Sequence, residues 1–104
     1  MKFSTTRRRG SGTTAMQMRD CAQSAIYVWV NGQLDYPKRL ALHLGRSDLR
    51  IVSPSFLSNY QFAGLRMTDL VLDHACELNS MELYGYQAAR ISIHAYQGAT
   101  RGKL

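Results

Sequence analysis

The sequence predicts one α/β domain, built on a small, mostly parallel sheet with flanking helices. Short apolar runs at residues 25–30, 49–53 and 70–72 are rich in Ile, Val and Leu, which favours buried strands. Stretches with helical spacing of apolar residues separate these runs, and such alternation is typical of a parallel sheet with right-handed crossovers. With 104 residues, 45% of them hydrophobic, the chain can bury one modest core, so we expect a single domain over residues 1–104.

The first part of the chain predicts a strand, a loop and a helix. Residues 2–6 have the composition of a short edge strand, and the glycines of residues 7–12 favour a loop. Thr13 or Thr14 would then cap the first helix, because a threonine hydroxyl can accept from the free N–H groups of a first turn.

A second helix is expected after the strand at residues 25–30, which ends at an Asn-Gly turn signal. Asp35 is placed to cap this helix, and Pro37 falls in its first turn, where a missing backbone donor costs nothing. Gly45 ends it, because glycine readily takes the left-handed conformation found after helices.

The second half of the chain predicts a loop, a strand, a helix and a last strand. Residues 55–67 lack a clear period and read as a loop with one helical turn, ahead of the central strand at residues 70–72. A helix should start at Ser80. The alternation at residues 90–95 predicts the final strand, and residues 97–104 read as a basic, flexible tail.

The charge of +6 comes from the two ends of the chain, because the basic and acidic residues between positions 10 and 100 cancel. The end charges are Lys2, Arg7, Arg8, Arg9, Arg101 and Lys103. Basic, flexible ends near 1–9 and 97–104 favour phosphate, nucleic acid or an acidic protein surface as partner, and a solvated tail is the alternative.

Membrane insertion and export are not indicated by the sequence. No apolar run exceeds residues 25–30, and residues 1–7 lack the apolar centre of a signal peptide. We therefore expect a soluble, cytoplasmic protein without a membrane partner. Cys21 and Cys76 are far apart and in no metal-binding or redox spacing, which favours two buried thiols in a reducing compartment.

Asp73 is the residue best placed for chemistry. It follows the strand at residues 70–72 directly, and ligands of open α/β sheets bind beyond the carboxyl ends of the strands. His74, Cys76 and His94 are the nearest metal-ligating residue types, but they lack the paired spacing of a zinc site. The sequence therefore predicts no metal centre, apart from Asp73 as a magnesium candidate.

Two segments resemble the motifs of a P-loop NTPase. The run Arg9-Gly10-Ser11-Gly12-Thr13-Thr14 before a helix resembles a Walker A element, and residues 70–75, which include Asp73, resemble a Walker B element. Residues 50–54 and 91–94 are similar to the neighbouring strands of helicase-type, RecA-like domains. The resemblance implies a minimal RecA-like fold in which ATP and Mg²⁺ would be the cofactors of a functional P-loop.

The match to this family is degenerate at the positions that carry the chemistry. Thr13 stands where the family has a lysine on the terminal phosphates, and His74 where many members have the glutamate that orients water. Gly12, Thr14 and Asp73 keep their places, and Arg9 offers a guanidinium for phosphate. We therefore expect no turnover, no catalytic residue and no bound cofactor, with a nucleotide-dependent phosphohydrolase as the alternative.

The resemblance also suggests where a partner would bind. In helicase-like domains, the loop that matches residues 55–67 contacts single strands, and here it carries Tyr60, Phe62 and Arg66. Aromatic residues and arginine are also enriched at protein interfaces. Compact degenerate domains of this type resemble proteins encoded by bacteriophages, which implies a viral accessory protein in the host cytoplasm.

We therefore expect a non-catalytic protein that binds a host protein, with a nucleic-acid-binding protein as an alternative. Its binding residues would come from two loops that meet at the carboxyl edge of the sheet: Arg7, Arg8, Arg9, Tyr60, Phe62 and Arg66.

Overall fold

The computed structural model describes the backbone of residues 10–102 and the side chains of residues 12–95. Along this part of the chain the elements are α1 (Gly10–Asp20), β2 (Ile26–Val28), α2 (Asp35–His43), β3 (Arg50–Val52), α3 (Ser55–Ser58), β4 (Leu70–Leu72) and α4 (Ser80–Gly102).

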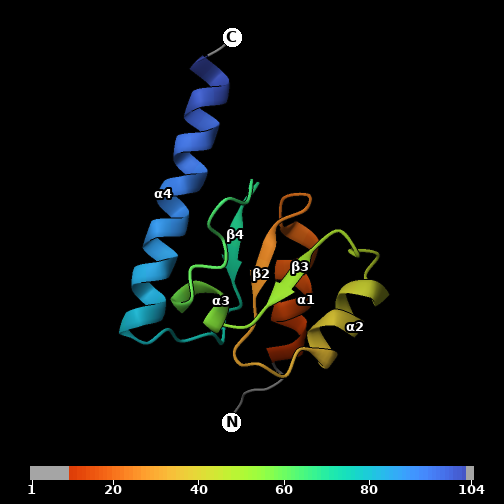
Figure 1. Cartoon of the computed structure of the whole chain (residues 1–104). Helices are drawn as coiled ribbons and strands as arrows, with labels where there is room; N and C mark the ends of the chain where they lie inside the picture. The colour runs from red at the N-terminus through yellow and green to blue at the C-terminus, as the bar shows by residue number, and fades with distance from the viewer. Residues whose placement is uncertain (1–9, 103–104) are drawn as a thin grey trace.

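The strands form a parallel sheet in the order β3-β2-β4. Tyr27 of β2 lies opposite Ile51 of β3 and Val71 of β4, so β2 is the central strand. Helices α1 and α2 cover one face of the sheet, and α3 and α4 cover the other (Figure 1). The predicted class, a small parallel sheet with flanking helices, is confirmed.

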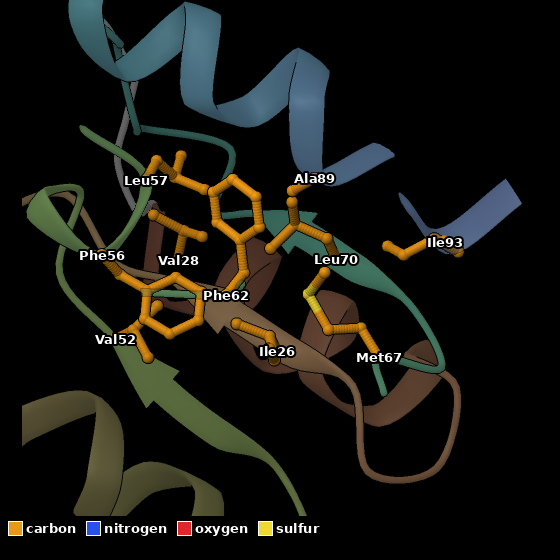
Figure 2. Close-up of a cluster of buried hydrophobic side chains, with 10 residues drawn as sticks. All are labelled: Ile26, Val28, Val52, Phe56, Leu57, Phe62, Met67, Leu70, Ala89 and Ile93. Carbon is orange, nitrogen blue, oxygen red and sulfur yellow. The ribbon is translucent and has the colours of Figure 1, made fainter. Parts of the chain in front are cut away.

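Alternation along β2 divides the core into two halves. Ile26 and Val28 point towards α3 and α4, where Figure 2 shows them among side chains from both other strands and from α4. Tyr27 points to the opposite face, where Met18 of α1 and Ala41 of α2 cover it. Since successive side chains of a strand alternate between faces, three short strands are enough to anchor both helical layers.

Helix α4 approaches α3 through a glycine. A Cβ on Gly85 would lie 2.0 Å from the backbone oxygen of Leu57. Residue 85 therefore has to be glycine for the two helices to approach this closely. The close approach lets Ala89 and Ile93, one and two turns further on, reach the core.

The last predicted strand is wrong. Residues 90–95 lie inside α4, and this helix continues to Gly102 through most of the predicted tail. The alternation of Ile91 and Ile93 misled the prediction, because Ile93 shares its buried face with Ala89 at helical spacing while Ile91 is exposed. Residues 103–104 lie outside the described part.

The start of α1 also differs from the prediction. The helix begins at Gly10, so Gly12 is helical rather than in a loop, and Thr13 and Thr14 lie within the helix instead of capping it. The expected strand at residues 2–6 and the arginines at 7–9 are outside the described residues.

Two of the three features predicted for α2 are confirmed. Pro37 is in the first turn, and Gly45 follows the helix with a φ of +73°. Asp35 is the first helical residue and not the cap, because Leu34 precedes it without a side-chain capping bond. The predicted helical turn within residues 55–67 is α3, and the start of α4 at Ser80 is confirmed.

Arg46 fastens the end of α1 to the loop after α2. Its guanidinium donates to the carbonyl oxygens of Met18 at 2.6 Å and Arg19 at 3.0 Å. It also donates to those of Cys21 and Ala22, just beyond the end of α1. It also pairs with Asp48 at 2.9 Å. A cation at a helix C-terminus compensates the carbonyls that lack partners in the helix.

Candidate functional site

The carboxylate of Asp73 lies buried at the carboxyl end of β4 and holds three elements together. Its Oδ1 accepts from the Thr14 hydroxyl of α1 at 2.9 Å and from the Tyr27 hydroxyl of β2 at 2.5 Å. Its Oδ2 accepts from the backbone N–H of Ala75 at 3.0 Å. Both Asp73 and Thr14 are almost inaccessible to water, with exposed fractions of 2% and 3%.

Gln17, one turn after Thr14, makes a second set of hydrogen bonds between α1 and the end of β4. Its Nε2 donates to the carbonyl oxygen of Leu72 at 3.1 Å, and its Oε1 accepts from the backbone N–H of His74 at 2.7 Å. Sequence reasoning missed Gln17 and Tyr27. The available signal was the i, i+3 spacing of Thr14 and Gln17, which places both on one face of α1.

Burial raises the pKa of Tyr27, and the hydrogen bond to Asp73 raises it further. Tyr27 therefore stays a neutral donor at ordinary pH. The pKa of the Cys76 thiol is raised to about 11 by burial and by the nearby Glu82 and Asp73. Because the thiolate is the reactive form, Cys76 is a poor nucleophile in this setting.

The surroundings of Asp73 differ from those of a P-loop nucleotide site. Asp73 is buried, and its two oxygens accept three hydrogen bonds from the chain's own groups, which leaves about one of the roughly four acceptor positions of a carboxylate. Gly10 and Gly12 are helical, so they do not form a loop whose N–H groups cradle phosphate. Among the side chains of residues 12–95, no group of three His, Cys, Asp or Glu could hold a metal.

The predicted aromatic loop is divided between surface and core. Phe62 is buried in the core at 4% exposure, and its ring lies 6.3 Å from that of Phe56. Tyr60 is 44% exposed, has a φ of +51° and rests against Phe62. Arg66 is exposed at the other end of the loop. Replacing Phe62 would thus test folding, and Tyr60 is the aromatic residue available to a partner.

The loop at residues 55–67 runs from one edge of the sheet to the other, and whether it forms one surface with residues 7–12 stays a prediction. Tyr60 follows α3, near the carboxyl end of β3, but the chain then crosses to the amino end of β4, where Thr68 donates to the carbonyl oxygen of Gln23 at 2.8 Å. Helix α1 begins at the carboxyl edge, beside Asp73. Arg7, Arg8 and Arg9 lie outside the described residues.

A groove of about 560 Å³ follows the outer edge of β3. Leu34, Ala41 and Leu42 line it from the side of α2, and Phe56 and Gln61 from the side of α3. Leu42 is 66% exposed, so the groove offers apolar surface that the described part of the chain does not cover.

The backbone of Ile51 faces this groove. Arg50 N–H donates to the carbonyl oxygen of Ala25 at 3.1 Å, and the carbonyl oxygen of Val52 accepts from Trp29 N–H at 2.8 Å, so both flanking residues bond towards β2. In a parallel ladder, alternate residues direct their backbone groups to opposite sides. The N–H and C=O of Ile51 therefore point away from β2, where the described part of the chain supplies no strand.

The opposite edge of the sheet is closed by side chains. On β4, the carbonyl oxygen of Leu70 accepts from the Arg90 guanidinium at 2.9 Å, and that of Leu72 accepts from Gln17. Arg90 also pairs with Asp69 at 2.8 Å. Proteins commonly protect exposed strand edges in such ways, and the contrast leaves β3 as the edge able to receive a further strand.

Two exposed cations flank the groove, one on each face of the sheet, and a third basic residue of the lining, Arg46, is paired with Asp48. Lys38 lies on α2 at the groove wall, and Arg50 has its guanidinium carbon 5.6 Å from the centre of the Phe56 ring on the opposite face. Both residues are exposed. Sequence reasoning did not single out either of them, because net charge was read from the two ends of the chain.

No helix in the described part of the chain is long and apolar enough to span a membrane. Comparison of the chain with protein-family models, with curated proteins and with solved structures returned no match.

Proposed function

We propose that the protein is a non-catalytic binding domain that takes an extended, acidic segment of a partner protein along the outer edge of β3. The single observation that carries this function is the open edge at Ile51 inside a groove lined by apolar and basic side chains. Addition of a strand to a free sheet edge draws its affinity from backbone hydrogen bonds and its specificity from the adjoining pockets.

The chemistry of the groove supports an acidic partner segment. A bound strand would place alternate side chains above and below the sheet, where Lys38 stands on one side and Arg50 on the other. Charge complementarity of this kind contributes mainly to specificity and to the rate of association. Apolar residues of the segment would cover Leu42 and its neighbours.

Asp73 supports the non-catalytic part of the proposal. Its carboxylate joins α1, β2 and β4 and is almost inaccessible to water, which supports a structural role for this residue. A degenerate, RecA-like ancestry and a bacteriophage setting belong to the same proposal, and in that setting the partner would be a host protein.

Binding of two short synthetic peptides tests the proposal. One peptide repeats Val-Val-Glu-Glu, which places Glu on both faces of an extended strand, and the other repeats Val-Val-Lys-Lys. Their binding to the full chain is followed by fluorescence anisotropy. We expect the acidic peptide to bind and the basic peptide to bind more weakly or not at all. Equal binding of the two, or no binding of either, would contradict the proposal.

Charge-reversal variants locate the interaction. Lys38→Glu and Arg50→Glu should each weaken binding of the acidic peptide about two- to fivefold, the effect of losing one exposed ion pair of roughly 0.5 to 1 kcal/mol. Arg39→Glu is the matched control, because Arg39 neighbours Lys38 on α2 but lines a different depression. An equal loss of affinity in Arg39→Glu would show that the peptide is attracted only by the overall charge of the protein.

The two alternative functions give different results. A phosphohydrolase would release phosphate from MgATP and lose that activity in Asp73→Ala. A nucleic-acid-binding protein would bind a single-stranded oligonucleotide with an affinity that falls steeply as salt rises, because binding releases counterions.

A further inference from the structure

A depression of about 640 Å³ lies at the carboxyl end of the central strand, β2. It is lined by residues 29–36 and by Arg39, which belong to the loop after β2 and to the first turns of α2. Of its lining residues, Leu34 alone also lines the groove along β3. The depression is therefore distinct from the groove of the proposed function.

The depression lies where two connections leave the sheet in opposite directions. The loop after β2 leads to α2 on one face, and the loop after the neighbouring strand β4 leads to α4 on the other (Figure 1). The Cys76 thiol donates to the carbonyl oxygen of Trp29 at 3.5 Å, so the two loops meet. Open α/β sheets bind ligands outside the carboxyl ends of their strands at such a divergence.

Two aromatic rings line the depression. The ring centroids of Trp29 and Tyr36 are 5.8 Å apart, and the ring planes are tilted by 45°. Trp29 packs partly against the core between the sheet and helices α1 and α2, whereas Tyr36 is 45% exposed. A pair of rings that is anchored in the core and open to solvent offers a surface on which a planar ligand can stack.

Two charges of opposite sign stand beside these rings. Asp35 and Arg39 lie one turn apart on α2, both line the depression and both are exposed. Within the described part of the chain, neither side chain makes a hydrogen bond or an ion pair. A guanidinium binds carboxylates and phosphates, and a carboxylate accepts hydrogen bonds from N–H groups.

We infer that this depression binds a small molecule that combines a planar, nitrogen-containing ring with an anionic group. The ring stacks on Trp29 and Tyr36, an N–H of the ring or of its amino group donates to Asp35, and the anionic group accepts from Arg39. An anion without a ring would meet the repulsion of Asp35 and gain no stacking. Nucleoside monophosphates and indole carboxylates share this chemistry.

NMR titration of the isotope-labelled full chain tests the inference. The chain contains one tryptophan, so the indole N–H of Trp29 gives a single signal that reports on the depression. The probes are adenosine monophosphate and indole acetate. We expect a saturable shift of the Trp29 signal with at least one of them, and the probe that binds identifies the source of the ligand. The same ring without its anion, adenosine or indole, should bind about two- to fivefold more weakly.

Variants locate the two parts of the ligand. Arg39→Gln should weaken binding of the probe about two- to fivefold, and Tyr36→Leu at least about fivefold, because stacking on the ring is lost. Lys38→Gln is the control, since Lys38 is the exposed neighbour of Arg39 but lines the groove along β3. It should bind the probe as the wild type does.

Three outcomes would each overturn the inference. They are an unchanged Trp29 signal with both probes at millimolar concentration, equal binding of a ring with and without its anion, and equal affinities of Arg39→Gln and Lys38→Gln for the probe. None of them bears on peptide binding along β3, because Lys38 and Arg50 flank that groove and Arg39 does not line it.

Discussion

Tyr27 and Asp73 meet at 2.5 Å across two neighbouring strands, with the phenol as donor and the carboxylate as acceptor. The bond lies where a nucleotide-binding sheet would present its acid to a metal. In this protein the same acid receives a side chain of its own sheet, together with Thr14 from the helix above it. The carboxylate therefore acts as a structural tie.

Tyr27→Phe should destabilise the fold by about 2 kcal/mol, because it removes one donor from a buried carboxylate. Urea denaturation measures this loss. Tyr36→Phe is the control, since Tyr36 is 45% exposed and its hydroxyl has no comparable buried partner. A nucleotide site would respond differently, because MgATP would then stabilise the wild type against unfolding.

Stability should fall at alkaline pH because of Tyr27. Its folded pKa is raised above the ordinary value of 10.0 by burial and then by Asp73. The unfolded chain therefore loses this proton first, and the contribution of Tyr27 is present below about pH 10 and lost as the pH rises further. Between about pH 9 and pH 11, unfolding free energy should decline more steeply in the wild type than in Tyr27→Phe. Parallel profiles would contradict the assignment.

Arg46→Lys should cost about 2 kcal/mol of stability although it keeps the charge. The guanidinium reaches carbonyl oxygens at the end of α1 and Asp48 at once, and an ammonium cannot match that planar fork. Thermal or urea unfolding of Arg46→Lys beside Arg39→Lys measures the difference. A loss of similar size in the exposed control would show that the contacts of Arg46 do not stabilise the helix end.

Gly85→Ala should be among the most harmful single changes. The added methyl group would meet the backbone oxygen of Leu57, which cannot move without shifting α3, so we expect a loss of about 3 kcal/mol or more. Gly32→Ala is the control, because a Cβ at Gly32 meets nothing within 4 Å. Retained stability in Gly85→Ala would mean that α3 and α4 are not held as described.

The sequence predicted the three described strands and their parallel arrangement because each is a compact apolar run bounded by turn residues. It failed for residues 90–95, where the alternation of Ile91 and Ile93 fits a strand as well as a helix with one buried and one exposed face. Only the contact of Ala89 and Ile93 with the core distinguishes the two. Local pattern alone does not contain that information.

The candidate sites show a similar limit. Asp73 could be placed at the end of a strand from sequence, but its partner Tyr27 is separated from it by 46 residues and is defined only by strand order. The openness of the edge at Ile51 likewise depends on which strand has a neighbour. Lys38 and Arg50 come to flank the same groove only when α2 and β3 are folded together.

The exchange rate of the Ile51 amide proton, measured by NMR with and without the Val-Val-Glu-Glu peptide, tests the proposed binding function most directly. In the free protein, this N–H should exchange faster than that of Arg50, which is bonded to Ala25. At saturating peptide the exchange should slow by roughly tenfold or more, because a carbonyl oxygen of the bound strand accepts a hydrogen bond from the Ile51 N–H. An Ile51 amide that is already as protected as Arg50, or that is unchanged by a bound peptide, would contradict the proposal.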